Sequence, residues 1–129
     1  MSSPPLSPPR VLVVDDGLLN IEIATHLLTE AGMQVATALD GSGVLAQVAA
    51  FAPDIVLMDI QLPGLDGLTL TQQLRSQAST RALVIVAFTA YAMKGDREKF
   101  LAGGCDAYIS KPIDVDTFAD EVRALLPAR

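Results

Sequence analysis

Cysteine and histidine are almost absent from this chain of 129 residues, which contains one of each, Cys105 and His26. A single cysteine excludes a disulfide framework and a cysteine-rich zinc site. A single histidine excludes a histidine-rich metal site, and it excludes a serine–histidine catalytic pair unless His26 is the base. We expect His26 to lie on the polar side of a helix and Cys105 to be a small buried residue.

Basic residues are also scarce, because 9 Lys and Arg stand against 15 Asp and Glu and give a net charge of −6. This balance argues against a nucleic-acid or anionic-membrane surface. No apolar run approaches the roughly 20 residues that span a bilayer, and the first residues, MSSPPLSPPR, lack the apolar core of a signal peptide. We therefore expect a soluble, cytoplasmic protein with no direct nucleic-acid binding and no membrane insertion.

The composition indicates one folded domain. Half of the residues are hydrophobic and 19% are charged, which excludes disorder for the bulk of the chain. A chain of this length suits a single domain that buries its own core. Four of the eight prolines fall within the first nine residues, so we predict a flexible Pro/Ser-rich tail over 1–9. The domain itself is predicted over 10–126, with a short C-terminal tail over 127–129.

Short apolar runs alternate with helical periodicity from Arg10 onward. We predict strands at 11–14, 33–38, 55–58, 83–88 and 107–109, and helices at 18–31, 42–51, 68–76, 96–102 and 115–126. Asp66 and Asp114 are candidate helix caps. This alternation predicts an α/β fold with a parallel sheet covered on both faces. The second strand is partly polar and the fifth is short, so we place both at the edges, in the doubly wound order 2-1-3-4-5.

Polar residues collect where the predicted strands end. Asp15 and Asp16 follow the first strand, Asp59 the third, Thr89 the fourth and Lys111 the fifth. Ligands of open parallel sheets bind at this edge, near the switch point. Two carboxylates about 5 Å apart repel by roughly 3 kcal/mol at an effective dielectric near 20. Either one acid is protonated or a cation lies among them, and carboxylate oxygens with room for water suit Mg²⁺.

The same side chains could receive a phosphoryl group. Lys111 and a metal would neutralise the phosphoryl oxygens, and Thr89 would donate a hydrogen bond to one of them. The nucleophile would then be a carboxylate, which forms an acyl phosphate.

Four segments resemble the signature of response-regulator receiver domains: VLVVDD, PDIVLMDIQLPGLDG, VIVAFTAYA and YISKPID. The resemblance covers residues 10–126, with the motifs in the family's order and spacing. It implies a flavodoxin-like (βα)5 fold and a phosphoacceptor of a two-component or phosphorelay system. Such a domain is a signalling module that catalyses only its own phosphorylation and dephosphorylation. It signals through the face formed by the fourth helix, fifth strand and fifth helix.

The resemblance also implies the metal and phosphate sites. Asp59 matches the phosphoacceptor aspartate. Asp15 and Asp16 match the acid pair that binds Mg²⁺, and the backbone carbonyl of Gln61 matches a further protein ligand.

Three more residues match the family's switch and phosphate-pairing positions. Thr89 matches the switch hydroxyl and Tyr108 the switch aromatic. Lys111 matches the lysine that pairs with phosphate, and its bond to Pro112 is usually cis in the family.

The chain departs from the commoner family pattern at two positions. Gly17 follows the acid pair where a larger residue is usual, and we expect it to loosen the start of the first helix. Tyr91, like Gln61, occupies a position that flanks the phosphoryl group. We expect Tyr91 to shield the site and to slow self-dephosphorylation.

The implied partners are a sensor histidine kinase or histidine phosphotransfer protein, docked through Leu18 and Leu19, and a downstream effector protein. A homodimer is possible. Two alternatives stay open: a receiver module excised from a hybrid histidine kinase or multidomain regulator, and a phosphorylation-independent scaffold.

Two other classes fit the residues less well. A phosphatase of the haloacid-dehalogenase kind needs an acid two residues after its nucleophile, where this chain has Gln61. A flavodoxin-like flavin carrier needs a Ser/Thr/Gly-rich phosphate loop, whereas Asp15 and Asp16 would repel a phosphate in the absence of a metal.

Overall fold

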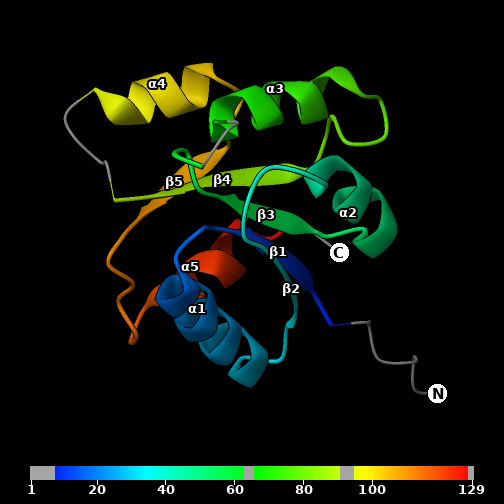
Figure 1. Ribbon diagram of the computed structural model, residues 1–129. Coiled ribbons are helices and arrows are strands. Elements are labelled where there is room, and N and C mark those ends of the chain that lie inside the picture. The colour runs from blue at the N-terminus through cyan, green and yellow to red at the C-terminus, as the bar shows by residue number, and fades with distance from the viewer. Residues whose placement is uncertain (1–7, 63–65, 91–94, 128–129) are drawn as a thin grey trace.

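The fold is built around a parallel sheet, seen in a computed structural model that describes residues 8–62, 66–90 and 95–127 (Figure 1). Its strands are β1 (Arg10–Val14), β2 (Gln34–Ala38), β3 (Ile55–Met58), β4 (Val84–Thr89) and β5 (Ala107–Ser110). All neighbouring pairs are parallel, in the order β2-β1-β3-β4-β5. The predicted fold class, strand order and edge strands are therefore confirmed.

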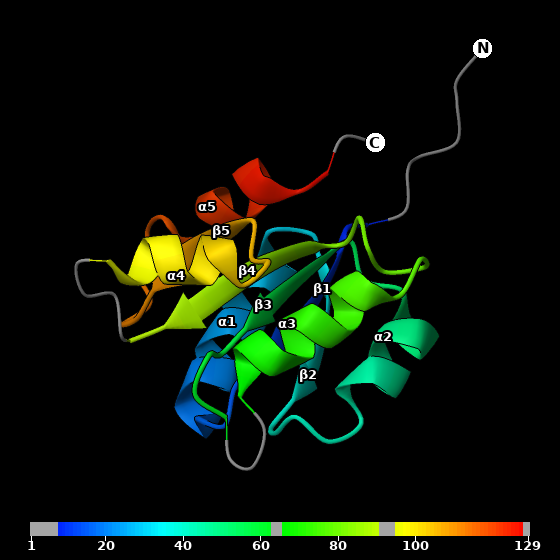
Figure 2. The same ribbon diagram turned by 90° about the horizontal axis from the view of Figure 1, so that it is seen from above.

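Helices cover both faces of the sheet. They are α1 (Leu18–Glu30), α2 (Val44–Phe51), α3 (Gly67–Ser76), α4 (Asp96–Ala102) and α5 (Phe118–Leu125). α1 and α5 lie against one face, and α2, α3 and α4 lie against the other (Figures 1 and 2). Among the described residues, no helix is both long enough and apolar enough to cross a bilayer.

Each central strand contributes to two separate cores. In β1, Leu12 and Val14 join the core beneath α2, α3 and α4, while Val11 and Val13 join the core beneath α1 and α5. All four side chains are fully buried. A strand buried on both faces must be apolar at every position, which explains why β1, β3 and most of β4 read as continuous apolar runs.

The two cap predictions have different outcomes. Asp66 caps α3, because its Oδ1 accepts a hydrogen bond from the Thr69 N–H at 2.9 Å. Asp114 does not cap α5, which begins at Phe118 rather than near Val115. Its carboxylate instead accepts the N–H of Asp116 at 2.9 Å and closes a local turn before the helix. A short Asx turn competes with helix initiation, so the prediction was wrong here.

Other predictions concern single side chains and the chain ends. His26 is exposed and Cys105 is buried, as predicted. Most of the predicted N-terminal tail, residues 1–7, lies outside the described residues, as do 128–129. The carbonyl of Pro9 accepts a hydrogen bond from the Gln34 N–H at 2.8 Å, so the described part of the tail adjoins β2.

Candidate functional site

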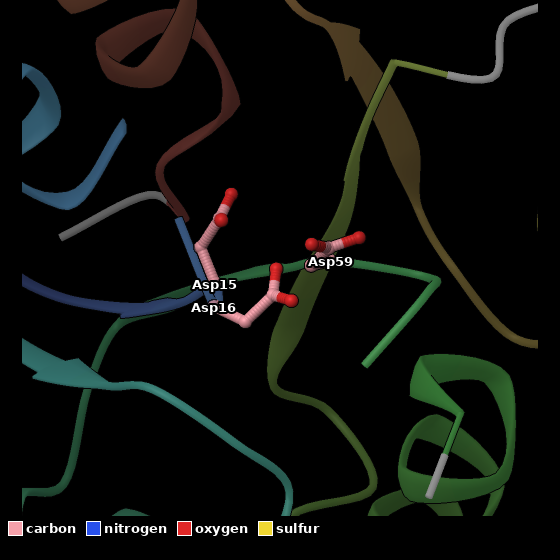
Figure 3. A group of neighbouring side chains, drawn as sticks. All are labelled: Asp15, Asp16 and Asp59. Carbon is pink, nitrogen blue, oxygen red and sulfur yellow. The ribbon is translucent and has the colours of Figure 1, made fainter. Parts of the chain in front are cut away.

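The acid cluster forms where β1 and β3 end, beside the point at which the strand order reverses. The Asp15 N–H donates to the carbonyl of Ala38 and the Asp59 N–H donates to the carbonyl of Val14, both at 2.9 Å. These bonds extend the sheet one residue beyond the strands and fix both backbones. Asp15, Asp16 and Asp59 each place a carboxylate oxygen within 4.8 Å of the others (Figure 3).

Two of the three acids are buried and anchored. Asp15 is 1% exposed and Asp59 is 5% exposed, whereas Asp16 faces solvent. Asp15 Oδ1 accepts the Gly17 N–H at 2.7 Å, and Asp59 Oδ1 accepts the Gln61 N–H at 2.9 Å. One oxygen of each buried carboxylate is thereby held by the loop that follows it, while the second oxygen of each contacts Lys111.

Lys111 brings the positive charge. Its Nζ lies 2.5 Å from Asp15 Oδ2 and 3.2 Å from Asp59 Oδ2. The ammonium also sits 4.9 Å from the centre of the Phe88 ring. The Lys111 N–H donates to the Thr89 carbonyl at 2.8 Å, and the Lys111–Pro112 bond is cis, as the resemblance implied.

The charges of the cluster do not balance. Three carboxylates lie together, and Lys111 contacts two of them. Each carboxylate pair about 5 Å apart repels by roughly 3 kcal/mol at an effective dielectric near 20. Burial raises the pKa of Asp59 above its ordinary value, and the nearby Asp15 charge adds to this. The Gln61 N–H and Lys111 act in the opposite direction. The cluster is therefore short of positive charge.

Asp15 Oδ2 is an oxygen that needs positive charge beside it. This buried oxygen has an ion-pair contact with Lys111 but no hydrogen-bond partner among the described residues. A buried carboxylate oxygen needs a cation beside it, and the one Lys111 ammonium serves Asp15 and Asp59 at once. Clustered hard oxygens of this kind suit Mg²⁺ better than a softer metal.

The remaining predicted residues lie around the cluster. Thr89 ends β4 and is buried, and it is paired in register with Ser110 of β5. Tyr108 is 36% exposed, with its ring centre 6.4 Å from that of Phe100, so it packs toward α4 rather than joining the acids. Gln61 is exposed next to Asp59. Tyr91 lies outside the described residues.

Two glycines lie beside the acids, and the sequence pointed to only one of them. Gly17 precedes α1 in an extended conformation without a side-chain cap, and its backbone N–H holds Asp15. Its effect on the flexibility of α1 stays a prediction. Sequence reasoning missed Gly67, whose N–H donates to the Ile60 carbonyl at 3.0 Å beside the phosphoacceptor candidate. The available signal was a glycine at the first position of a helix, where a better helix former is usual.

Comparison with known proteins agrees with this geometry. The curated relatives include the polar-differentiation response regulator DivK of Brucella anthropi, which is 39% identical over 119 residues, covering 92% of this chain and 97% of the relative. The DivK protein of Brucella ovis is 39% identical over 116 residues, covering 90% of this chain and 94% of the relative.

Solved structures show the same architecture. The chemotaxis response regulator CheY4 of Vibrio cholerae superposes with a TM-score of 0.86 at 25% identity, covering 92% of this chain and 99% of that one. The receiver domain of a sensor histidine kinase of Pseudomonas aeruginosa superposes with a TM-score of 0.82 at 30% identity, covering 92% and 97%. That structure holds a magnesium ion in its active-site cleft.

A family profile identifies the chain as a whole. The profile described as the response regulator receiver domain matches residues 11–123. This range contains all of the sheet except its first residue, the three clustered acids and Lys111. The switch-point geometry and the match over residues 11–123 lead to one conclusion: the chain belongs to the family of response regulator receiver domains.

Proposed function

We propose that this chain is a phosphoacceptor that takes a phosphoryl group onto Asp59 from a phosphohistidine. The observation that carries the proposal is the convergence of Asp15, Asp16, Asp59 and Lys111 at the switch point of the sheet. We further propose that residues 10–126 form this receiver unit, that it works in the cytoplasm, and that it catalyses only its own phosphorylation and dephosphorylation.

Mg²⁺ is the proposed cofactor. Asp15, Asp16, Asp59 and the backbone carbonyl of Gln61 would hold it, and the strongest indication is that the buried Asp15 and Asp59 share a single ammonium. When bound, the ion supplies positive charge that neutralises oxygens of the incoming phosphoryl group. The chain supplies a rigid carboxylate frame, because backbone N–H groups already fix one oxygen of Asp15 and one of Asp59.

Asp59 is the proposed nucleophile. A carboxylate oxygen of Asp59 forms a bond to phosphorus as the phosphorus–nitrogen bond of the donor breaks. The departing nitrogen keeps the electron pair of that bond, and the imidazole binds one proton. Burial of Asp59 strips water from the attacking oxygen. Lys111, already 3.2 Å from Asp59 Oδ2, is placed to stabilise the negative charge that arrives.

Thr89 and Tyr108 are the proposed switch. Thr89 is buried at the end of β4, two strands from Asp15, where its hydroxyl would follow the phosphoryl group. Tyr108 is only partly exposed and packs against Phe100 of α4. An inward turn of Tyr108 would reshape the surface of α4, β5 and α5, which we propose as the face read by a downstream effector or by a second copy of the chain.

The proposed donor docks beside the acids. Leu18 and Leu19, at the start of α1, are 63% and 67% exposed. They directly follow the Asp15–Gly17 loop, so an apolar partner surface there would lie next to the cluster. A sensor histidine kinase or a histidine phosphotransfer protein is the partner we propose. The similar domain from a sensor histidine kinase supports the alternative that this receiver is one module of such a kinase.

The test is a change in mass. The chain is incubated with acetyl phosphate and Mg²⁺, and intact-protein mass spectrometry counts the phosphoryl groups gained. We expect one group on the wild type, none with Asp59→Asn and none after chelation of Mg²⁺. Asp114→Asn is the matched control, because Asp114 is exposed and its carboxylate accepts the Asp116 N–H rather than joining the cluster, and it should react as the wild type does.

The opposite result is equally informative. A folded wild-type chain that binds Mg²⁺ but gains no phosphoryl group, even in rapid-quench samples, would contradict the proposal. It would favour the phosphorylation-independent scaffold.

A further inference from the structure

Gly67, the first residue of α3, lies against the backbone that carries Asp59. A Cβ atom at this position would lie 2.2 Å from the Asp59 carbonyl oxygen and 3.0 Å from the carbonyl carbon of Asp59 and the Cα of Ile60. The nearest of these distances is far below van der Waals contact, and all three atoms belong to the main chain. A side chain here could be admitted only by moving the phosphoacceptor loop or the start of α3.

Hydrogen bonds hold this close contact from both sides. The Gly67 N–H donates to the Ile60 carbonyl at 3.0 Å, which ties the helix start to the loop. The hydroxyl of Thr71, a fully buried residue of α3, donates to the Gly67 carbonyl at 2.8 Å. The Asp66 carboxylate caps the same turn through the Thr69 N–H. The first turn of α3 is therefore a fixed support for the loop.

The supported loop carries Asp59, the proposed phosphoacceptor, and Gln61, whose carbonyl is a proposed metal ligand. Asp59 Oδ1 accepts the Gln61 N–H at 2.9 Å, so the carboxylate and the Gln61 peptide are linked to each other. Ile60, between them, is bonded to Gly67. A displacement of the Asp59–Ile60 backbone thus moves both the carboxylate and the backbone of Gln61, whose carbonyl we propose as a ligand.

We infer that Gly67 is a positioning residue for the cation site: the absence of a side chain there lets α3 set the position of the Asp59 carboxylate and the Gln61 carbonyl. The inference rests on the proposed function. It adds that Mg²⁺ affinity depends on a residue that supplies no ligand atom. Groups that orient metal ligands typically contribute roughly 10- to 100-fold to metal affinity.

The first experiment compares Gly67→Ala with Gly103→Ala. A Cβ at Gly103 would meet the end of the Leu68 side chain at 2.8 Å and the Lys99 carbonyl at 3.3 Å, so this control also crowds a neighbour but lies away from the acids. Calorimetric titration with Mg²⁺ gives the dissociation constant, and denaturation in chelator gives the stability. We expect Gly67→Ala to bind Mg²⁺ at least roughly tenfold more weakly, and Gly103→Ala to bind as the wild type does, even where both lose stability.

A second measurement uses the wild type alone, so that it stands if Gly67→Ala fails to fold. Amide hydrogen exchange compares the Gly67 N–H, bonded to the Ile60 carbonyl, with the Gly103 N–H, bonded to the Lys99 carbonyl at 3.0 Å. Since coupling between two sites is reciprocal, saturating Mg²⁺ should slow exchange at Gly67 by a larger factor than at Gly103.

The outcomes separate the two proposals. Equal Mg²⁺ affinity of Gly67→Ala and wild type, or equal slowing of the two amides, would overturn the positioning role and leave the proposed function intact. A wild-type chain that binds no Mg²⁺ would overturn both.

Discussion

The acids at the amino-terminal ends of the strands and those at the carboxyl-terminal ends lie in opposite charge environments. We call these two sides of the sheet its amino-terminal and carboxyl-terminal edges. At the amino-terminal edge, the Asp106 carboxylate accepts the Ile85 N–H at 2.9 Å and pairs with Arg75 at 2.7 Å. Arg75 also donates to the carbonyls of Gly104, Arg81 and Leu83. Asp54 accepts the Arg10 N–H at 2.8 Å. Here, each acid named is matched by a donor or a positive charge.

At the carboxyl-terminal edge, three carboxylates lie together, and two of them, the buried Asp15 and Asp59, share the ammonium of Lys111. The comparison teaches that one sheet can hold both kinds of site. An edge that only stabilises the fold satisfies its charges within the chain. The edge that we propose to bind a cation and to receive a phosphoryl group has an excess of negative charge that these two ligands would meet.

The largest expected effect comes from Arg75→Met at the amino-terminal edge. Loss of three hydrogen bonds to carbonyls and of the Asp106 pair should lower the free energy of unfolding by about 3 kcal/mol. Urea denaturation measures this, with the exposed Arg97→Met as control. Since Arg75 is far from the acids, its Mg²⁺ affinity should match that of the wild type. A loss below about 0.5 kcal/mol, the level of ordinary surface changes, would contradict the structural role.

The next effect is that of Mg²⁺ on the carboxyl-terminal edge. At a concentration 100 times its dissociation constant, a ligand that binds only the folded state stabilises it by about 2.7 kcal/mol. We expect this gain for the wild type and for Arg75→Met, and a much smaller gain for Asp15→Asn, which changes the buried ligand. Thermal unfolding in Mg²⁺ and in chelator gives the difference. An undiminished gain in Asp15→Asn would place the ion elsewhere.

Neutralising one acid at each edge should change the free energy of unfolding in opposite directions. In chelator, Asp59→Asn should raise the free energy of unfolding by about 1–2 kcal/mol, because it removes like-charge repulsion and the burial of a charge. Asp106→Asn should lower it by about 1 kcal/mol, because Asp106 is half-exposed and its pairing with Arg75 is partly screened. Denaturation of both variants under the same conditions is the measurement. A change of the same sign in both variants would contradict the difference in charge balance between the two edges.

The smallest effect is a pH dependence carried by Asp59. Burial raises its pKa in the folded state above the ordinary value of 3.8. As pH rises through 3.8, the unfolded carboxyl loses its proton first, so the unfolded state is favoured until the folded carboxyl also ionises. Metal-free wild type should therefore lose stability relative to Asp59→Asn across this window. The difference between their free energies of unfolding should become constant at higher pH. A constant gap from pH 3 to 7 would contradict the raised pKa.

Much of the fold and of the site could be predicted from local features. The apolar runs at 11–14 and 55–58 identified buried strands. The polar Gln34 and the short run near Tyr108 identified β2 and β5 as the outermost strands of the sheet. The acids at strand ends were predicted to converge because parallel strands bring their carboxyl ends together. The start of α5 was missed, because the Asp114 turn and a helix cap have the same sequence signal.

The sequence by itself determined the class of fold, the strand order and the residues that gather at the switch point. The spacing of apolar residues identifies each strand and helix over a few residues, and the parallel topology then brings the ends of the strands together. Only the tertiary structure decided how the charges are shared. It placed Lys111 between Asp15 and Asp59 and brought Asp16 beside them. It also brought the backbone of Gly67 so close to the Asp59 carbonyl that a side chain at position 67 would collide with it. Such contacts depend on distances of tenths of an ångström between residues far apart in the chain, which no local pattern encodes.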